Sequence, residues 1–516
     1  MAPRSLVGTA LVAAALTLVA GCTSGASRVQ RAGATASPPP AVSPSSSASA
    51  QAPPSPLRPS ADVRTGRGWP IDVTRARLRS ARSRPVEDPY YPDTSNPEFD
   101  ALHYLLRLDW NGTRLKGRAT VVFRAAATTR QLRLDLSHAL RAGSVRLDGR
   151  SIAYTQPGDA IVMRTRRLRA NTRHVVTIAY AGVPHSTPAP SRRSDLAEGL
   201  GWNVDRHGSV YTFQEPYGAF TWYPVNDEPS DKALYDAVIS THGRDVAVFN
   251  GDLVSRSRHG GTTVSRWHLD APAASYLTTL AIGPYSRSVV TTGRGMDIAY
   301  WVLPRDRSTL RILETEGSNA FDWLVAHAGP YPFDSLGVVV VDGDSAMETQ
   351  TMITFGRTEL SRPDSVLEHE MAHQWFGDSL TPRTWADLWL NEGWAMYMEQ
   401  WFESSTHRQP YAGGISHWRR LDQQSRDRSG PPASYDPQTF GDVNVYLGPA
   451  MMLDAIRLRI GDGAFDRLVR AWARQHAHST VSRALFTRWL HADTGRQFGP
   501  LLHAWLDSAR TPRLPR

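Results

Sequence analysis

The 516-residue chain is nearly free of cysteine and of lysine. Its single cysteine is Cys22, so a disulfide within the chain is impossible and the folded part must be held together by packing. Lys116 and Lys232 are the only lysines, and the formal net charge of +9 therefore comes almost wholly from arginine. No recognisable nucleic-acid-binding module accompanies this charge, so we assign it to the surface and expect no nucleic-acid partner.

An apolar run near the amino terminus is too short to span a bilayer comfortably. It extends from Leu6 to Ala20, follows the positive charge of Arg4, and ends in Val19-Ala20-Gly21-Cys22. This pattern resembles a bacterial lipoprotein signal, which implies removal of residues 1–21 and acylation of the Cys22 thiol. The alternative is an ordinary signal peptide that happens to contain a cysteine. On the first interpretation the protein is exported and lipid-anchored at the extracytoplasmic face of the cell membrane.

Residues 22–87 contain few apolar side chains. They are rich in serine, alanine, proline and, toward their end, arginine, so they cannot bury enough surface to offset the entropy of ordering. We therefore predict a disordered tether. A basic run near its end has two interpretations, a solvated linker face or a contact with anionic cell-surface polymer. The run consists of Arg75, Arg77, Arg79, Arg82 and Arg84.

The remaining chain divides into two regions of different periodicity. In residues 88–286 apolar side chains recur with a period of two, as at Leu132, Leu134 and Leu136, and glycine, aspartate and asparagine mark frequent turns. This predicts an antiparallel all-β amino-terminal domain. Residues 287–516 combine strand-like runs with helical patterns and become almost entirely helical toward their end, which predicts an α/β-to-α domain.

The stretch His369-Glu370-Met371-Ala372-His373 falls within one of the helical patterns. Two histidines four positions apart point to the same side of a helix, so their imidazoles can bind one ion together. Glu370 is offset by about 100° from His369, which places its carboxylate beside the ion without making it a ligand. A general base that takes a proton from water activated by a metal needs this position.

Two histidines leave a catalytic zinc one protein ligand short of its usual three. The segment from Trp385 to Gly393 predicts a second helix with an apolar face, and this helix carries Glu392. If it packs against the first helix, the carboxylate of Glu392 reaches the ion. We therefore predict one Zn²⁺ per chain, held by His369, His373 and Glu392.

These motifs resemble the aminopeptidase N family of zinc metallopeptidases, the gluzincins with HExxH, eighteen residues and a glutamate in Asn-Glu-Gly. The flanks Gln374-Trp375-Phe376-Gly377 and Leu388-Trp389-Leu390 match the same family pattern. The resemblance runs from about residue 88 to the carboxyl end. It implies a saddle-like β domain followed by a thermolysin-like zinc peptidase domain, and peptides with a free amino terminus as substrates. Larger members continue into a helical-repeat domain, so a short form with a more open site is expected.

Three further site residues follow from the resemblance. Ser345-Ala346-Met347-Glu348-Thr349 is similar to the family's Gly-x-Met-Glu-Asn motif, which implies that Glu348 binds the substrate's amino group, with Ser345 and Thr349 as departures. Glu215 matches a second amine-binding glutamate, and Tyr446 matches a tyrosine that stabilises the oxyanion.

The resulting hypothesis is a zinc-dependent aminopeptidase in which Glu370 is the general base and Tyr446 supports the oxyanion. Two rival functions remain. The same metal centre also suits another hydrolysis, either internal peptide cleavage or epoxide opening. A non-catalytic surface-binding protein with this fold is the second rival, although such a protein is expected to have lost metal ligands that are present here.

Overall fold

The computed structural model describes residues 75–94, 96–191, 193–361, 363–406 and 411–514. The predicted lipoprotein signal, Cys22 and the predicted tether up to residue 74 lie outside the described residues. In the part of the chain that is described, no helix has both the length and the apolar character needed to cross a lipid bilayer.

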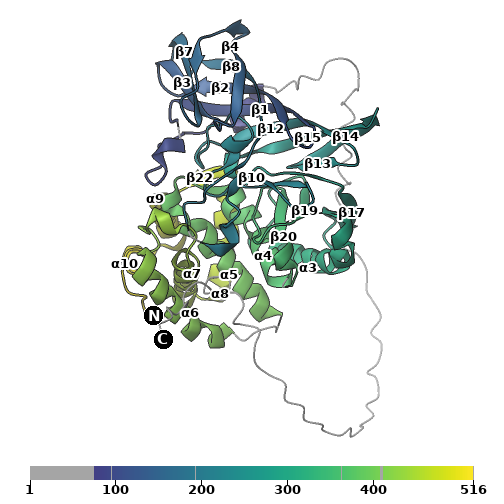
Figure 1. The fold of residues 1–516 in the computed structure, drawn as a ribbon. Helices are drawn as coiled ribbons and strands as arrows, with labels where there is room; N and C mark the ends of the chain where they lie inside the picture. The colour runs from purple at the N-terminus through teal and green to yellow at the C-terminus, as the bar shows by residue number, and fades with distance from the viewer. Residues whose placement is uncertain (1–74, 95, 192, 362, 407–410, 515–516) are drawn as a thin grey trace, which may run out of the picture.

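Strands build the amino-terminal domain, which forms the upper half of Figure 1. Its largest sheet has the order β14-β15-β12-β1-β2-β8-β4-β5, a second sheet has the order β13-β16-β11-β10-β9, and a third has the order β3-β7-β6. The strands are β1 (Phe99–Trp110), β2 (Leu115–Ala125), β3 (Thr129–Asp135), β4 (Leu140–Leu147), β5 (Arg150–Ser151), β6 (Tyr154–Thr155), β7 (Ala160–Leu168), β8 (Arg173–Gly182), β9 (Ser186–Thr187), β10 (Leu200–Val204), β11 (Val210–Phe213), β12 (Ala233–His242), β13 (Val246–Phe249), β14 (Asp252–His259), β15 (Thr262–Ala273) and β16 (Leu280–Gly283).

The period-two pattern of the sequence explains how these strands form one core. In β2 the side chains of Leu115, Ala119 and Val121 are buried, whereas Lys116 and Arg118, at alternate positions of the same strand, are exposed. Because successive side chains of a strand point to opposite faces, one face of the sheet packs inward and the other meets solvent.

One strand pair departs from the predicted antiparallel arrangement. β1 and β12 lie side by side and run parallel, with Leu106 opposite Ala237. The chain builds β2 to β11 before it returns to this position, and parallel pairing requires such a long connection. Alternating hydrophobicity shows which side of a strand is buried, but it does not show the direction of the neighbouring strand.

The prediction of a disordered tether is wrong for residues 75–87. Here α2 (Arg75–Ser80) packs on the β domain, where Leu78 and Ala81 are buried. The guanidinium of Arg77 forms an ion pair with Asp270 of β15. The average composition of the tether conceals these few apolar side chains, which are enough to attach its last part to the sheet.

A four-stranded sheet in the order β17-β18-β19-β20 joins the two domains. Its central strand β19 (Leu336–Val341) is fully buried and contacts a different core on each side. Val339 and Val341 belong to the core of the β domain, whereas Val338 and Val340 belong to the core of the helices. The other strands are β17 (Ser286–Thr291), β18 (Asp297–Val302) and β20 (Met352–Gly356).

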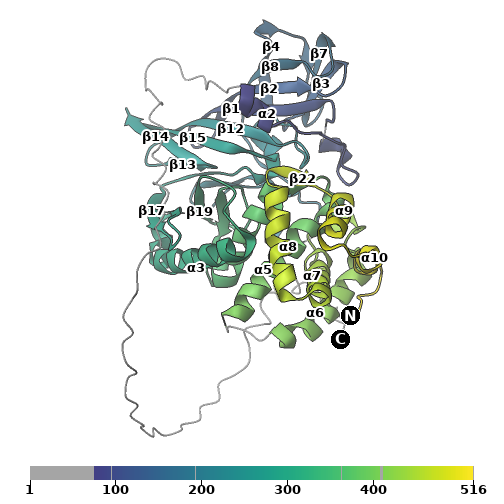
Figure 2. The same cartoon turned by 180° about the vertical axis from the view of Figure 1, so that it is seen from behind.

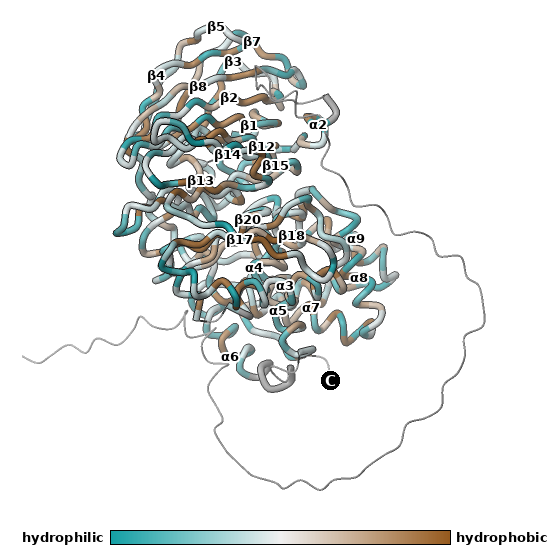
Figure 3. The backbone as a smooth tube through the Cα atoms, turned by 90° about the vertical axis from the view of Figure 1, so that its right-hand side faces the viewer, coloured by the Kyte–Doolittle hydropathy of each residue, from teal (hydrophilic) through white to brown (hydrophobic). Residues whose placement is uncertain are grey.

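Helices make up most of the remaining chain, and Figure 2 shows α8, α9 and α10 grouped beside α7. They are α3 (Leu310–Ala328), α4 (Pro363–Ala372), α5 (Trp389–Ser405), α6 (Tyr411–Ser429), α7 (Leu447–Ile460), α8 (Asp462–Gln475), α9 (Arg483–Thr494) and α10 (Gly499–Leu506), with the short strands β21 (Leu380–Pro382) and β22 (Ser479–Val481) between them. Figure 3 shows hydrophobic segments at β13 in the upper part of the molecule and at β18 below it. The predicted fold class is confirmed, since an all-β amino-terminal domain precedes an α/β-to-α domain.

Candidate metal centre

The helix that carries the two histidines ends in a wide turn. After α4 and His373 the chain enters the turn Gln374–Ser379, in which Gly377 has a φ of 149°. A Cβ on Gly377 would lie 3.0 Å from Nδ1 of His373, so glycine leaves the imidazole its space. The turn also places the carbonyl oxygen of Phe376 3.1 Å from this nitrogen, which donates a hydrogen bond to it.

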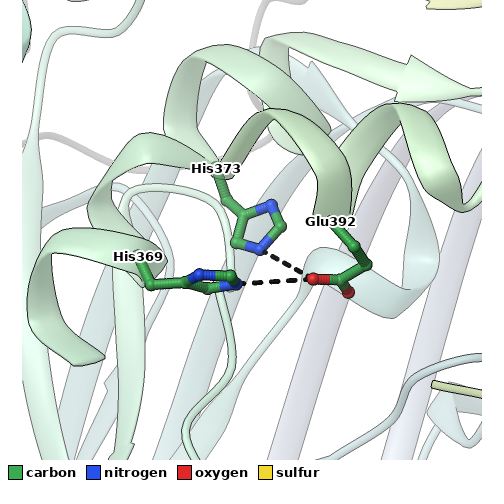
Figure 4. Close-up of side chains that lie close together, drawn as sticks. All are labelled: His369, His373 and Glu392. Atoms are coloured by element: carbon green, nitrogen blue, oxygen red, sulfur yellow. Dashed lines mark hydrogen bonds and ion pairs between the residues drawn. The ribbon is translucent and has the colours of Figure 1, made fainter. Parts of the chain in front are cut away.

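Helix α5 brings the third predicted ligand to the same point. Glu392 lies in its first turn, and one carboxylate oxygen, Oε2, is 3.4 Å from Nε2 of His369 and 3.5 Å from Nε2 of His373. Figure 4 shows the two imidazoles and this oxygen facing one another. The three groups therefore converge on a single point, as the sequence predicted from two helices packed together, and their ligand atoms all lie within 4.8 Å of one another.

The outer nitrogens of both imidazoles are also held. Nδ1 of His369 lies 2.9 Å from Oε2 of Glu399, which stands two helical turns after Glu392 on α5. With Nδ1 of His373 bound to Phe376, both rings direct Nε2 toward the common centre. Two imidazole nitrogens and a carboxylate oxygen with such supporting contacts suit a catalytic zinc, which keeps its fourth position open.

Glu370 lies next to this centre without joining the convergent set. It forms a separate buried group with Glu348 and His373, again with ligand atoms within 4.8 Å. Burial raises the pKa of Glu370 to about 8, although His369 and His373 oppose the effect. A carboxyl group that exchanges its proton near neutral pH is suited to general base and general acid work.

His369, His373 and Glu392 line a cavity of about 220 Å³ between the two domains. Glu215 comes from the β domain just after β11, and Glu348 follows β19, and both line this cavity. Each has a buried carboxylate oxygen with no hydrogen-bond partner among the described residues. Burial, followed by the charge of Glu348, raises the pKa of Glu215, and burial also raises the pKa of Glu348. A cationic group in the cavity would satisfy both carboxylates.

Tyr446 immediately precedes α7 and lines the same cavity. Its ring centroid is 6.0 Å from that of His369, with an angle of 29° between the ring planes. Burial raises the pKa of the phenol well above its ordinary value, so it remains a hydrogen-bond donor.

The two departures from the family motif both form hydrogen bonds. The hydroxyl of Thr349 donates to the carbonyl of Met352 and lies 2.9 Å from the hydroxyl of Thr354. The hydroxyl of Ser345 donates a hydrogen bond of 3.0 Å to Oδ2 of Asp195, across the domain boundary.

Two residues of the site were missed by the sequence reasoning. Glu399 follows Glu392 by seven positions, so its helical spacing was available as a signal once α5 was expected. Arg193 also lines the cavity, but it lies in a connection of the β domain far from the motifs. No local pattern distinguishes it from the many other arginines.

Residues 325–505 match the family described as the peptidase family M1 domain. Glutamyl aminopeptidase from Homo sapiens is 27% identical over 243 residues, which are 44% of this chain and 25% of that protein. Leucine aminopeptidase 2 from Candida glabrata is 26% identical over 304 residues, 54% of this chain and 45% of that protein. The match to glutamyl aminopeptidase from Bos taurus spans only 21% of that protein's length.

Solved structures show the fold over a larger part of the chain. The M1 zinc metallopeptidase from Deinococcus radiodurans, crystallised as a mutant with a Tyr-Ser-Ala substrate, has a TM-score of 0.72 at 24% identity. The comparison covers 82% of this chain and 98% of that one. A two-domain M1 zinc metallopeptidase bound to L-arginine gives a TM-score of 0.74 over 84% of this chain and 99% of the other.

Proposed function

Residues 325–505 match the peptidase family M1 domain, and from that match we propose that the protein is a zinc-dependent aminopeptidase. The observation that carries the proposal is the convergence of His369, His373 and Glu392 beside the buried carboxyl of Glu370. The donor set fits zinc, which when bound acts as a Lewis acid toward a peptide carbonyl and makes water more acidic.

The side chains around the centre supply the proton transfers and the charge stabilisation. Glu370 accepts the proton of the attacking water and later gives it to the leaving amine. The phenol of Tyr446 donates a hydrogen bond to the carbonyl oxygen as negative charge develops, an effect worth about 3 kcal/mol.

Recognition of a free amino terminus rests on Glu215 and Glu348. Their unpaired buried oxygens face the cavity from two different domains. A substrate ammonium placed between them forms charge-assisted hydrogen bonds and leaves the first peptide bond near the three metal ligands. The product is then one free amino acid and a shortened peptide.

We further propose that the enzyme is exported and anchored to the membrane by a lipid on Cys22. The support is the pattern of a charged start, an apolar run and a cysteine within residues 1–22. Residues 22–74 then act as a tether between the membrane and the folded domains, and the substrates are peptides at the extracytoplasmic face.

A matched pair of substrates tests the proposed activity. The purified protein should hydrolyse an aminoacyl reporter with a free amine and should hydrolyse its N-acetylated counterpart at least about a hundredfold more slowly, because acetylation removes the cation that the glutamates bind. A zinc chelator should abolish the reaction. The variant Glu348→Gln should raise KM for the free amine.

Equal rates on both substrates would favour an endopeptidase or another hydrolase, and no hydrolysis at all would favour a binding protein.

A further inference from the structure

Arg193 is the one arginine or lysine among the described residues that line the cavity. Its guanidinium reaches the catalytic domain from the β domain. Nε and Nη2 donate to the two carboxylate oxygens of Asp195 at 3.1 and 2.6 Å, and Nη1 donates to the carbonyl of Gly441 at 3.3 Å. The planar guanidinium is thus fixed by groups from both domains.

The approach of the guanidinium to Gly441 requires a glycine. This residue has a φ of 70°, and an added Cβ would lie 2.3 Å from Nη1 of Arg193. A side chain at position 441 would therefore strain the backbone and push the guanidinium away. The contact is consequently built into the backbone of the segment that leads to Tyr446.

The positive charge of the same guanidinium also acts on the phenol of Tyr446, where it opposes the rise in the pKa that burial causes, and both side chains line the cavity. On its other side the Tyr446 ring lies against the imidazole of His369, with 6.0 Å between the ring centroids. The phenol therefore interacts with a cation from the β domain, while its ring lies beside His369 of the proposed metal site. Since the guanidinium has no acceptor, it leaves the phenol hydrogen available for another partner.

Asp195 is held in turn by Ser345, whose hydroxyl donates a hydrogen bond of 3.0 Å to its Oδ2. Ser345 stands where the family motif has glycine, so the departure has a structural role in this chain. The result is a series of hydrogen bonds from Ser345 through Asp195 to Arg193, whose positive charge acts on the phenol of Tyr446.

We propose that Arg193 is a positioning residue for Tyr446, which it holds with the phenol O–H directed at the carbonyl oxygen of the bound peptide. A positive charge beside the phenol oxygen polarises the O–H bond and strengthens the hydrogen bond that the phenol donates. This inference rests on the proposed aminopeptidase function. It adds that the β domain, through Arg193, helps to stabilise the developing charge.

The first test compares turnover with binding in Arg193→Gln. We expect kcat to fall roughly tenfold, and KM to change less than about threefold, because the phenol acts mainly on the transition state. Calorimetric binding of a tetrahedral phosphinic peptide analogue should weaken by about the same factor as kcat/KM, whereas binding of a free amino acid should stay close to that of the wild type. Arg206→Gln, at an exposed arginine of the same domain, is the matched control and should behave as wild type.

A double-mutant cycle decides whether Arg193 acts through Tyr446. In the background of Tyr446→Phe, which has no hydroxyl, Arg193→Gln should lower kcat less than about twofold. A full tenfold loss in that background, or an effect of Arg193→Gln on KM alone, would overturn the inference and indicate a role toward Glu215 instead.

A milder variant keeps the inference testable if Arg193→Gln does not fold, as judged by thermal melting. Ser345→Ala removes one hydrogen bond from Asp195 and should lower kcat by roughly two- to threefold without changing KM. An unchanged kcat would then contradict the inference. A wild-type protein that releases no amino acid would refute the proposed function itself, whereas an active wild type with additive variants would refute only the role of Arg193.

Discussion

At the scale of single residues, the chemistry depends on Glu370 lying beside His369, His373 and Glu392 without being one of the three metal ligands. The carboxylate is buried and its pKa lies near 8, mainly because of desolvation. The neighbouring His369 belongs to the convergent set with Glu392, so the two adjacent residues have different tasks. Loss of Glu370 should therefore affect the reaction and leave metal binding intact.

This expectation gives the first prediction. Glu370→Gln should lower kcat by roughly a hundredfold to ten-thousandfold, because the amide cannot accept the proton of water. Steady-state kinetics with a free-amine reporter measure the loss, and elemental analysis should find the same metal content as in wild type. Asp493→Asn, at an exposed acid of α9, is the control with unchanged kinetics. A variant with wild-type kcat would remove Glu370 from the mechanism.

The central residues of the site were predictable because their spacing carries the geometry. His369 and His373 are one helical turn apart, and Glu392 lies near the start of the next long helix. Arg193 was not predictable, since its place in the cavity depends on how the β domain meets the catalytic domain. Such a contact depends on tertiary packing and leaves no local pattern.

At the scale of elements, the position of Glu392 depends on the contact between α5 and α7. Gly393 follows the ligand directly, and a Cβ there would lie 2.4 Å from Cβ of Pro449 on α7. A proline ring cannot move aside as a flexible side chain does. The glycine of Asn-Glu-Gly therefore lets the two helices approach closely in this chain.

Gly393→Ala should destabilise the protein by about 1–3 kcal/mol, because the two helices must separate. It should also weaken metal binding, since Glu392 moves with its helix. Thermal unfolding and a competitive zinc titration measure the two effects. Gly463→Ala in α8 is the matched control, because its Cβ meets only the end of Arg467 at 3.8 Å, and it should be neutral or slightly stabilising. Equal stabilities of the two variants would contradict this account of the contact.

The elements themselves were largely predictable, whereas their partners were not. Hydrophobic periodicity indicated the helices of the second domain and the strands of the first. The parallel pairing of β1 with β12 and the attachment of α2 both depend on partners distant in sequence. For α2 the deciding groups are two small buried contacts, at Leu78 and Ala81, within a segment of polar composition.

At the scale of the whole molecule, Lys232 connects the two domains. It is one of only two lysines, and its buried ammonium donates to the carbonyls of Asp378 and Ser379 at 2.7 and 3.2 Å and lies 2.8 Å from the hydroxyl of Thr381. Asp378 and Ser379 end the turn that follows His373, and Thr381 comes two residues later. Burial lowers the pKa of Lys232 to about 7, although Asp378 opposes the effect.

Lys232→Met should destabilise the protein by about 1–3 kcal/mol at pH 8, because it leaves buried acceptors without a donor. The deficit should grow with pH. Since the pKa of Lys232 is about 7 in the folded protein and 10.5 ordinarily, the unfolded state binds more protons between these values, and wild-type stability gains from rising pH. Denaturant unfolding at pH 6.5 and pH 9 measures the difference. Lys116→Met, at the exposed second lysine, should match wild type, and a deficit that shrinks with pH would contradict the account.

The proposed anchor gives a prediction for the complete protein in a bacterial host that acylates lipoproteins. Wild-type protein should partition with membranes and into a detergent phase, whereas Cys22→Ser should not carry lipid. The specific activity of the two purified forms should agree, because the described domains hold the site. Lipid-free wild-type protein would refute the anchor and leave the peptidase proposal untouched.

The central claim is that the imidazole of His369 in α4, the imidazole of His373 directly after α4 and the carboxylate of Glu392 in α5 bind a single ion. Elemental analysis of the folded, purified protein tests it most directly, with the variant His373→Ala prepared in parallel. We predict about one zinc per chain in the wild type and far less in the variant, as expected for a three-ligand catalytic site. Folded wild-type protein without a stoichiometric divalent ion, or a variant that retains the full amount, would contradict the claim.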